Sequence, residues 1–186
     1  MKPTLVIIGL GNPGAQYENT RHNVGFRALD ALSDAFGEGE WEEKQKFIST
    51  VQEARVVTVP VLLVKPNTFM NLSGNAAEKI VDFFKLDPAS QLLVVCDDVD
   101  LPLGTVRLRE NGGPGTHNGL RSLQEKYGEG YARLRIGLGA KPASESDLAA
   151  WVLSTPSPEE QAALQNAVEG IPELVSEFVL GTGEKG

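Results

Sequence analysis

The chain has 186 residues, of which 41% are hydrophobic and 23% are charged, so it has the size and composition of one ordinary globular domain rather than of a disordered or collagen-like protein. A single cysteine excludes an intramolecular disulfide and favours a reducing compartment over secretion. The formal net charge of −8 argues against a broad nucleic-acid-binding surface, although residues 100–141 carry seven basic and four acidic side chains, which permits a small phosphate-binding patch.

The spacing of apolar residues predicts strands that alternate with helices. Continuous apolar runs indicate strands buried on both faces, and apolar residues three and four positions apart indicate helices with one buried face. In chain order, we expect a strand over residues 4–8, a helix from Thr20, strands over 47–59 and 61–65, a helix from Ser73 to near 86, strands over 92–96 and 105–109, a helix from Thr116 to near 127, a strand over 132–138, and a helix from Ser157 that breaks near 170–172. This alternation indicates a single three-layer α/β/α domain with a twisted, mostly parallel mixed sheet over residues 1–180, followed by a flexible tail at 181–186.

The connecting segments carry most of the turn-forming residues. The apolar run that ends at Leu10 is too short for a spanning helix, which needs ~20 residues, and Gly-Asn-Pro-Gly follows it directly, so a strand is favoured over a signal peptide. Residues 37–43 are polar and acidic and predict a break, while Pro60 leaves the register of the strands on either side of it open. At 157–160, Ser-Pro-Glu-Glu combines an N-cap, a proline at the first helical position and a capping-box glutamate.

Polar segments follow three of the apolar runs, at residues 9–14, 65–71 and 97–100. Ligands in folds of this class bind beyond the carboxyl ends of the strands, so these loops form the candidate site. His22 lies just beyond the first loop, and a histidine near its ordinary pKa of ~6.5 can take a proton from water at neutral pH. Asp97 ends a buried strand, where a carboxylate can fix the tautomer of a histidine and stabilise its protonated form. A lone histidine near a helix start is also a common surface or capping residue.

Two cofactor interpretations are open at these loops. Residues 9–14 match the Gly-x-Gly-x-x-Gly pattern of a dinucleotide site, but the polar stretch 16–19 delays the helix, and no acidic residue ends a second strand about 20 residues further on. Tight turns alone would explain these glycines. Asp97, Asp98 and Asp100 together could hold a magnesium ion, although turn capping is favoured for the last two.

Asparagines occupy loops or helix starts at four positions, Asn12, Asn23, Asn71 and Asn118. Turn chemistry alone would explain such asparagines. Their amides can also bind a carbonyl oxygen or a peptide backbone without charge, and such a donor contributes ~3 kcal/mol when it faces a developing oxyanion.

Taken together, these segments resemble one known family. The blocks are Gly-Leu-Gly-Asn-Pro-Gly at 9–14 followed by Tyr17, Thr-Arg-His-Asn at 20–23, Lys-Pro-Asn-Thr-Phe-Met-Asn-Leu-Ser-Gly at 65–74, Asp-Asp-Val-Asp-Leu-Pro-Leu-Gly at 97–104, Gly-Thr-His-Asn-Gly-Leu at 115–120 and Arg-Leu-Arg-Ile-Gly at 133–137. In this order, across residues 4–140, they closely resemble the bacterial-type peptidyl-tRNA hydrolases.

The resemblance implies a monomeric, cytoplasmic esterase that uses no metal and no other cofactor. Its partner would be peptidyl-tRNA, held through the acceptor end and the 5′-phosphate, with no membrane involved, and it would cleave the ester between peptide and ribose to release free tRNA. By the same resemblance, His22 is the general base, Asp97 orients it, and Asn12 and Asn71 position the peptide backbone, the substrate carbonyl and the attacking water. The implied substrate-binding residues are Asn23, Asn71 and Asn118, Tyr17 and Phe69 along the channel for the tRNA end and peptide, and Arg109 and Arg135 as a clamp for the 5′-phosphate.

The sequence departs from the family pattern at three places. Pro114 and Thr116 lie where the family commonly has glycine or histidine, so the loop before the helix is expected to be stiffer. Cys96 stands where a histidine is often found, which removes one possible hydrogen bond. Residues 142–186 carry eight acidic side chains and one basic side chain, a poor surface for holding tRNA. An RNA-binding module with this fold and no catalysis is the alternative from a different functional class.

Overall fold

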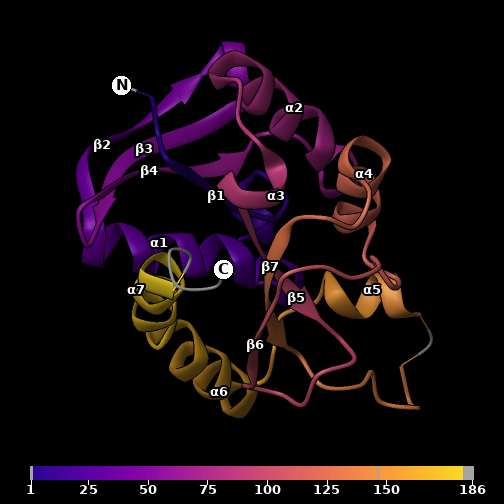
Figure 1. Ribbon diagram of the computed structural model, residues 1–186. Coiled ribbons are helices and arrows are strands. Elements are labelled where there is room, and N and C mark those ends of the chain that lie inside the picture. Colours follow the sequence, from indigo (N-terminus) through magenta and orange to yellow (C-terminus); the bar gives the residue numbers. More distant parts are fainter. Residues whose placement is uncertain (1, 146, 182–186) are drawn as a thin grey trace.

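The structure is a computed structural model that describes residues 2–145 and 147–181 (Figure 1). A seven-stranded sheet has the order β2-β3-β4-β1-β5-β7-β6. The strands are β1 (Leu5–Gly9), β2 (Gly37–Lys44), β3 (Ser49–Val56), β4 (Val59–Pro66), β5 (Leu92–Asp98), β6 (Val106–Arg109) and β7 (Ala132–Gly137). The four central strands β4, β1, β5 and β7 are parallel, and β2, β3 and β6 add antiparallel pairings at the two edges. The prediction of an α/β domain with a mostly parallel mixed sheet is confirmed, and the parallel strands form its centre.

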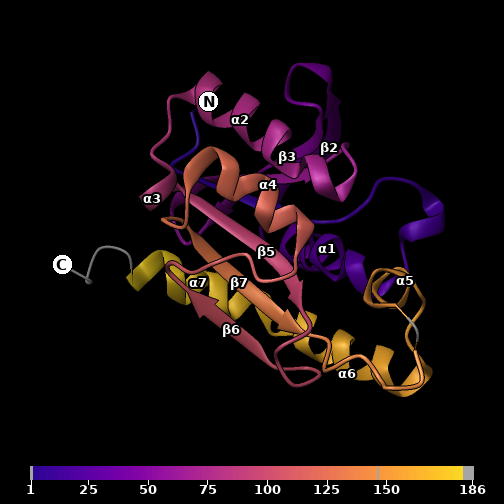
Figure 2. The same cartoon turned by 90° about the vertical axis from the view of Figure 1, so that its right-hand side faces the viewer.

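Helices cover both faces of this sheet. They are α1 (Val24–Phe36), α2 (Ser73–Phe84), α3 (Pro88–Gln91), α4 (Asn118–Tyr127), α5 (Leu148–Val152), α6 (Pro158–Glu169) and α7 (Ile171–Gly181). Figure 2 shows α2 and α4 on one side of the sheet and α6 and α7 on the other, and two buried apolar clusters fill the two interfaces. The expected three-layer arrangement is therefore present. Among the described residues, no helix is long and apolar enough to cross a membrane.

The central strand β1 shows why its sequence is apolar throughout. Side chains alternate between the two faces of a strand, so Ile7 packs toward α1, α6 and α7, whereas Ile8 packs toward α2 and α4. Both are 0% exposed. Truncation of either to alanine would cost about 2–5 kcal/mol of unfolding free energy, because the transfer term and the cavity add.

Three strand predictions need correction. The acidic segment expected as a break is β2, whose residues are exposed or half-buried and pair with β3. Charged side chains are common on an edge strand, where they discourage pairing with another chain, so polarity did not exclude a strand. The expected strand over 47–59 is instead β3 followed by a tight turn at Val57, whose φ is 59°, and Pro60 lies inside β4 opposite Arg55.

Two of the expected helix caps are also wrong. Ser73 is the first residue of α2 and donates its hydroxyl to the carbonyl of Met70 rather than capping from outside. At α4 the N-cap is His117 and not Thr116. The capping box at Ser157 is confirmed, and the short helices α3 and α5 were not predicted. Of the predicted tail, Gly181 ends α7, and residues 182–186 lie outside the described residues.

Candidate active site

The carboxyl ends of the parallel strands bring the predicted polar loops together. Asn12 follows β1, Asn71 follows β4, and Asp97 lies at the end of β5, while His22 is held on a 3₁₀ turn (Arg21–Asn23) that leads into α1. They border a cavity of about 590 Å³. Other residues that line this cavity are Phe69, Met70, Asp98, His117, Asn118, Leu120, Arg121, Arg135, Leu148, Val152 and Leu153.

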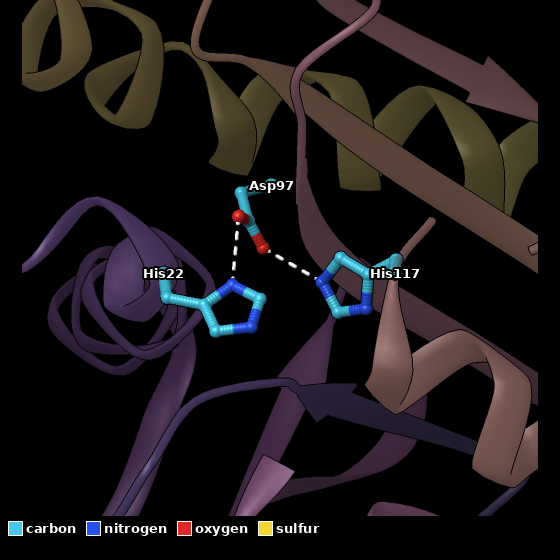
Figure 3. Close-up of side chains that lie close together, drawn as sticks. All are labelled: His22, Asp97 and His117. Carbon is cyan, nitrogen blue, oxygen red and sulfur yellow. Dashed lines mark hydrogen bonds and ion pairs between the residues drawn. The ribbon is translucent and has the colours of Figure 1, made fainter. Parts of the chain in front are cut away.

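His22 and Asp97 form the centre of the site (Figure 3). His22 Nδ1 lies 2.8 Å from Asp97 Oδ2, and the Asp97 side chain is 2% exposed. A carboxylate can only accept hydrogen bonds at neutral pH, so Nδ1 carries the proton and Nε2 is left with its lone pair. This is the tautomer that a histidine needs to take a proton from a ligand or from water.

His117 shares the same carboxylate. Its Nε2 lies 2.7 Å from Asp97 Oδ1, and its Nδ1 accepts hydrogen bonds from the backbone N–H groups of Gly119 and Leu120 at 3.1 and 3.2 Å. Because Nδ1 accepts from two backbone donors, the Nε2 nitrogen carries the hydrogen that is donated to Asp97. Asp97 thus has a histidine donor on each oxygen, as Figure 3 shows.

The prediction from sequence missed this residue. Thr116 appeared to be the cap because threonine is a common N-cap, and the histidine beside it carried no separate signal. The only sequence clue is that the second of two histidines lies directly before a helix within a glycine-rich loop.

Burial and charge act in opposite directions on the two members of the pair. Burial lowers the pKa of His22, but the charge of Asp97 and its hydrogen bond outweigh this and raise the pKa above its ordinary 6.5. Burial would raise the pKa of Asp97, yet the two histidines hold it well below its usual range. Asp97 therefore stays ionised throughout the neutral range and favours a protonated His22. Burial, followed by the Asp97 charge, raises the pKa of the adjacent Cys96 thiol, which makes Cys96 a packing residue and a poor nucleophile.

Asn12 is fixed by three hydrogen bonds. Its backbone N–H donates to Asn23 Oδ1 at 2.8 Å, and Asn23 Nδ2 donates back to the Asn12 carbonyl at 2.9 Å. The backbone N–H of Met70 donates to Asn12 Oδ1 at 2.8 Å. These contacts leave the Nδ2 amide of Asn12 as the group to offer a ligand. Asn23 is 1% exposed and lies behind Asn12, so the structure does not bring it to the cavity wall.

Three of the other predicted substrate-binding residues line the cavity, and Tyr17 lies just outside its lining. Asn71 and Asn118 are exposed and line the cavity, and Phe69 lines it with 55% of its surface exposed. Tyr17 makes an edge-to-face contact with Phe69, at 6.3 Å between ring centroids, from outside the lining. Together these two aromatic rings form a ledge at one side of the cavity.

Only one of the two predicted arginines lies at the cavity. Arg135 lines the cavity and donates to Asp98 Oδ2 at 3.2 Å and to the carbonyl of Gly113 at 2.9 Å. Arg109 is exposed on the edge strand β6, where it pairs with Arg133, and it lies outside the cavity. Arg107 pairs with Arg135, so alternation places Arg107 and Arg109 on the same face of β6 as Arg135.

Neither cofactor interpretation fits this geometry. Asp98 forms an ion pair with Arg135, and its Oδ1 accepts the backbone N–H of Asp100 at 2.8 Å in a turn. These contacts do not fit a magnesium site made by Asp98 and Asp100 with Asp97. A Cβ at Gly9 would lie 2.4 Å from Leu29 and one at Gly11 would lie 2.8 Å from Phe26. Gly9 and Gly11 therefore allow close packing of α1. The loop is followed by a 3₁₀ turn at Ala15–Tyr17, and α1 begins only at Val24, so the N-terminus of this α-helix does not lie within the glycines to receive a pyrophosphate.

A metal ion is a further possibility at the two histidines. One ligand atom each of His22, Asp97 and His117 lies within 4.8 Å of the others. Such an ion would have to replace both hydrogen bonds to Asp97. The second nitrogen of His117, Nδ1, already accepts hydrogen bonds from the backbone of α4, so only Nε2 could bind the ion, and Nε2 is the nitrogen that donates to Asp97. The three side chains are thus held together by hydrogen bonds to Asp97, and these bonds use the atoms that a metal ion would need.

Known proteins are similar to this chain in sequence and in fold. The family described as peptidyl-tRNA hydrolase matches residues 6–185. A peptidyl-tRNA hydrolase of Rhodospirillum centenum is 44% identical over 180 residues, which cover 97% of this chain and 78% of the relative. One from Fusobacterium nucleatum is 43% identical over 174 residues, or 94% of this chain and 88% of the relative. A crystal structure of peptidyl-tRNA hydrolase from Acinetobacter baumannii matches with a TM-score of 0.90 at 33% identity, covering 100% of this chain and 93% of that one.

Proposed function

The chain belongs to the peptidyl-tRNA hydrolase family, and from this premise we propose that it hydrolyses the ester between peptide and tRNA with His22 as the general base. The observation that carries the proposal is the 2.8 Å contact of His22 Nδ1 with Asp97, which leaves Nε2 unprotonated beside the cavity. Asp97 holds the ring in this tautomer and stabilises the imidazolium that forms.

The reaction needs one base and a few neutral donors. His22 Nε2 takes a proton from water, the hydroxide oxygen attacks the ester carbonyl, and the carbonyl oxygen becomes an oxyanion. The tetrahedral intermediate then expels the ribose oxygen, which receives the proton from His22. We assign stabilisation of the oxyanion and orientation of the water to the amides of Asn12 and Asn71, each worth ~3 kcal/mol in such a role.

Selectivity for peptidyl esters follows from the same uncharged amides. Asn118 or Asn71 can accept the N–H of the last peptide bond of the substrate through its side-chain oxygen. A simple aminoacyl ester has a free α-ammonium group instead, which must lose its water shell without matching geometry in the site. We therefore expect aminoacyl-tRNA to be a poor substrate.

The aromatic and basic residues at and near the cavity suit the two chain termini of tRNA, the 3′ acceptor end and the 5′-phosphate, which meet at the end of the acceptor stem. The ledge of Tyr17 and Phe69 offers aromatic faces for an unpaired base or a peptide side chain. Arg135 at the cavity and Arg109 outside it lie on a common sheet face that can meet the 5′-phosphate. Asn23 supports the site through Asn12. We further propose a single domain that acts as a monomer, in the cytoplasm where tRNA is used.

The direct test is release of free tRNA from N-acetyl-aminoacyl-tRNA by the purified protein, with aminoacyl-tRNA as the matched control. We expect multiple turnovers on the first substrate and little on the second, with rates unchanged after dialysis against a chelator. The alternative, an RNA-binding module without catalysis, predicts tRNA binding with no release. The alignment of His22, Asp97 and Asn12 around one cavity favours the hydrolase.

A further inference from the structure

Arg21, the residue directly before His22, is buried, and both of its terminal nitrogens form hydrogen bonds. Its side chain is 8% exposed, and its guanidinium carbon lies 4.5 Å from the centroid of the Trp151 ring. Nη1 donates to Ser154 Oγ at 2.5 Å and to the Trp151 carbonyl at 3.2 Å, and Nη2 bonds Glu160 Oε1 at 2.9 Å. The backbone N–H of Arg21 also donates to the Ser154 carbonyl. One side chain therefore joins the turn that holds His22 to a segment about 130 residues further along the chain.

That segment forms a wall of the cavity. Leu148, Val152 and Leu153, on and just after α5, line the cavity together with His22 and Asp97. Five residues are too few for a helix to be stable alone, so α5 depends on its tertiary contacts. Its buried anchor is Trp151, 3% exposed, which is the residue that the Arg21 guanidinium contacts.

Through its contact with Glu160, Arg21 is also bonded to α6. Glu160 Oε1 accepts the backbone N–H of Ser157 at 2.9 Å in the capping box and also binds Arg21. The start of α6 and the end of α5 are thus both held to the turn that holds His22. An arginine suits this position, because a lysine has one nitrogen and cannot reach the Ser154 and Glu160 acceptors in fork geometry.

We infer that Arg21 is a positioning residue that fixes the α5 wall of the cavity relative to His22. The inference rests on the proposed function, because it concerns where the substrate lies with respect to the base. Arg21 does not line the cavity and does not contact Asp97, so it acts through α5 and not through the chemistry of the base. The apolar wall contacts the bound substrate before and during the reaction, so its displacement weakens both states similarly and affects KM more than kcat.

The test compares Arg21→Lys with Arg27→Lys. Arg27 lies six residues further along, in α1, and donates to Gln165 of α6 at 3.0 Å, away from the cavity, so it is a control arginine that bonds α6 rather than α5. For Arg21→Lys we expect faster amide hydrogen exchange over residues 148–154, a KM for N-acetyl-aminoacyl-tRNA raised about tenfold, and an acid limb of the pH–rate profile that does not move. Arg27→Lys should change none of these.

Glu160→Gln provides a milder second variant, because glutamine keeps the capping box but removes the charge that faces Arg21. It should give a smaller change in the same direction in both exchange and KM. Unchanged exchange over 148–154 in Arg21→Lys, or faster exchange with a KM equal to that of Arg27→Lys, would overturn the inference. A shifted acid limb would also overturn it, since Arg21 would then act on the base. If the unaltered protein released no tRNA, the proposed function would fail, while the exchange data would still decide whether Arg21 holds α5.

Discussion

His22 Nδ1 and Asp97 Oδ2 lie 2.8 Å apart although 75 positions separate them in the chain. The strand β5 brings the carboxylate to the end of the sheet, and the turn before α1 brings the ring to the same place. Asp97 accepts a second bond from His117, so its two oxygens are not interchangeable.

Asp97→Asn should nearly abolish turnover through the tautomer of His22. The bonds from the backbone of α4 keep His117 Nε2 a donor, so the oxygen of the new amide pairs with His117. The NH2 group then faces His22 Nδ1 and forces the proton onto Nε2, which can no longer act as the base. We expect a loss of about 10³-fold in kcat, measured by tRNA release. Activity within a few-fold of the unaltered protein would show that the carboxylate does not set the tautomer.

The pH dependence should report the His22–Asp97 contact. His22 must be neutral to accept a proton, so kcat/KM should rise with pH through the His22 pKa, which Asp97 raises above 6.5. In Asp97→Asn the raising charge is gone while burial remains, so the midpoint of any residual activity should move to lower pH. A midpoint below 6.5 in the unaltered protein would contradict this assignment.

The same shift has a consequence for stability. Because the folded-state pKa of His22 is raised, the stabilisation from its protonated form is fully present below pH 6.5 and is lost as pH rises through the folded-state pKa. The difference in unfolding free energy between the unaltered protein and His22→Asn should therefore shrink over that interval. Chemical denaturation at a series of pH values measures it.

His117 should matter more for stability than for chemistry. His117→Ala removes the cap of α4 and one partner of a buried carboxylate, for which we expect about 1–3 kcal/mol of lost unfolding free energy. Turnover should fall less than in Asp97→Asn, because Asp97 keeps its bond to His22. His117→Asn is the control, since asparagine is a good N-cap and should recover part of the loss. Equal stability of the alanine variant and the unaltered protein would contradict the capping role.

Binding of tRNA should depend only modestly on salt. If Arg109, Arg135 and a few neighbours contact phosphates, the slope of log affinity against log salt should be about −2 to −4. Arg109→Gln should make this slope shallower by about one, because one phosphate contact is lost. Arg55→Gln, on the distant strand β3, should leave the slope unchanged. A slope near −8 would indicate a much larger basic surface than the two arginines provide.

The sequence predicted best those parts of the fold that local patterns determine. The apolar runs of β1 and β5 and the Ser157 capping box need no knowledge of distant residues. The edge strand β2 was missed because pairing with β3, and not its own composition, makes it a strand. The helix α5 was missed for a similar reason, since it depends on a residue outside the segment, Arg21, which contacts the ring and the carbonyl of Trp151.

The candidate site also has parts that follow from local sequence patterns and parts that depend on tertiary contacts. The placement of Asp97 at the end of a buried strand and of His22 beside a polar loop could be predicted from sequence, whereas their roles stay predictions. The tertiary contacts around them were not. The role of His117 depends on which carboxylate its Nε2 meets, and the position of Asn23 depends on its reciprocal bonds with Asn12. No spacing in the sequence distinguishes such a support from a residue that contacts the ligand.

The central claim is that the His22 imidazole removes the proton from water, and His22→Ala tests it most directly. Turnover of N-acetyl-aminoacyl-tRNA should fall by about 10³-fold or more, while circular dichroism and tRNA affinity remain close to those of the unaltered protein. A well-folded His22→Ala protein that released tRNA at a near-normal rate would contradict the account.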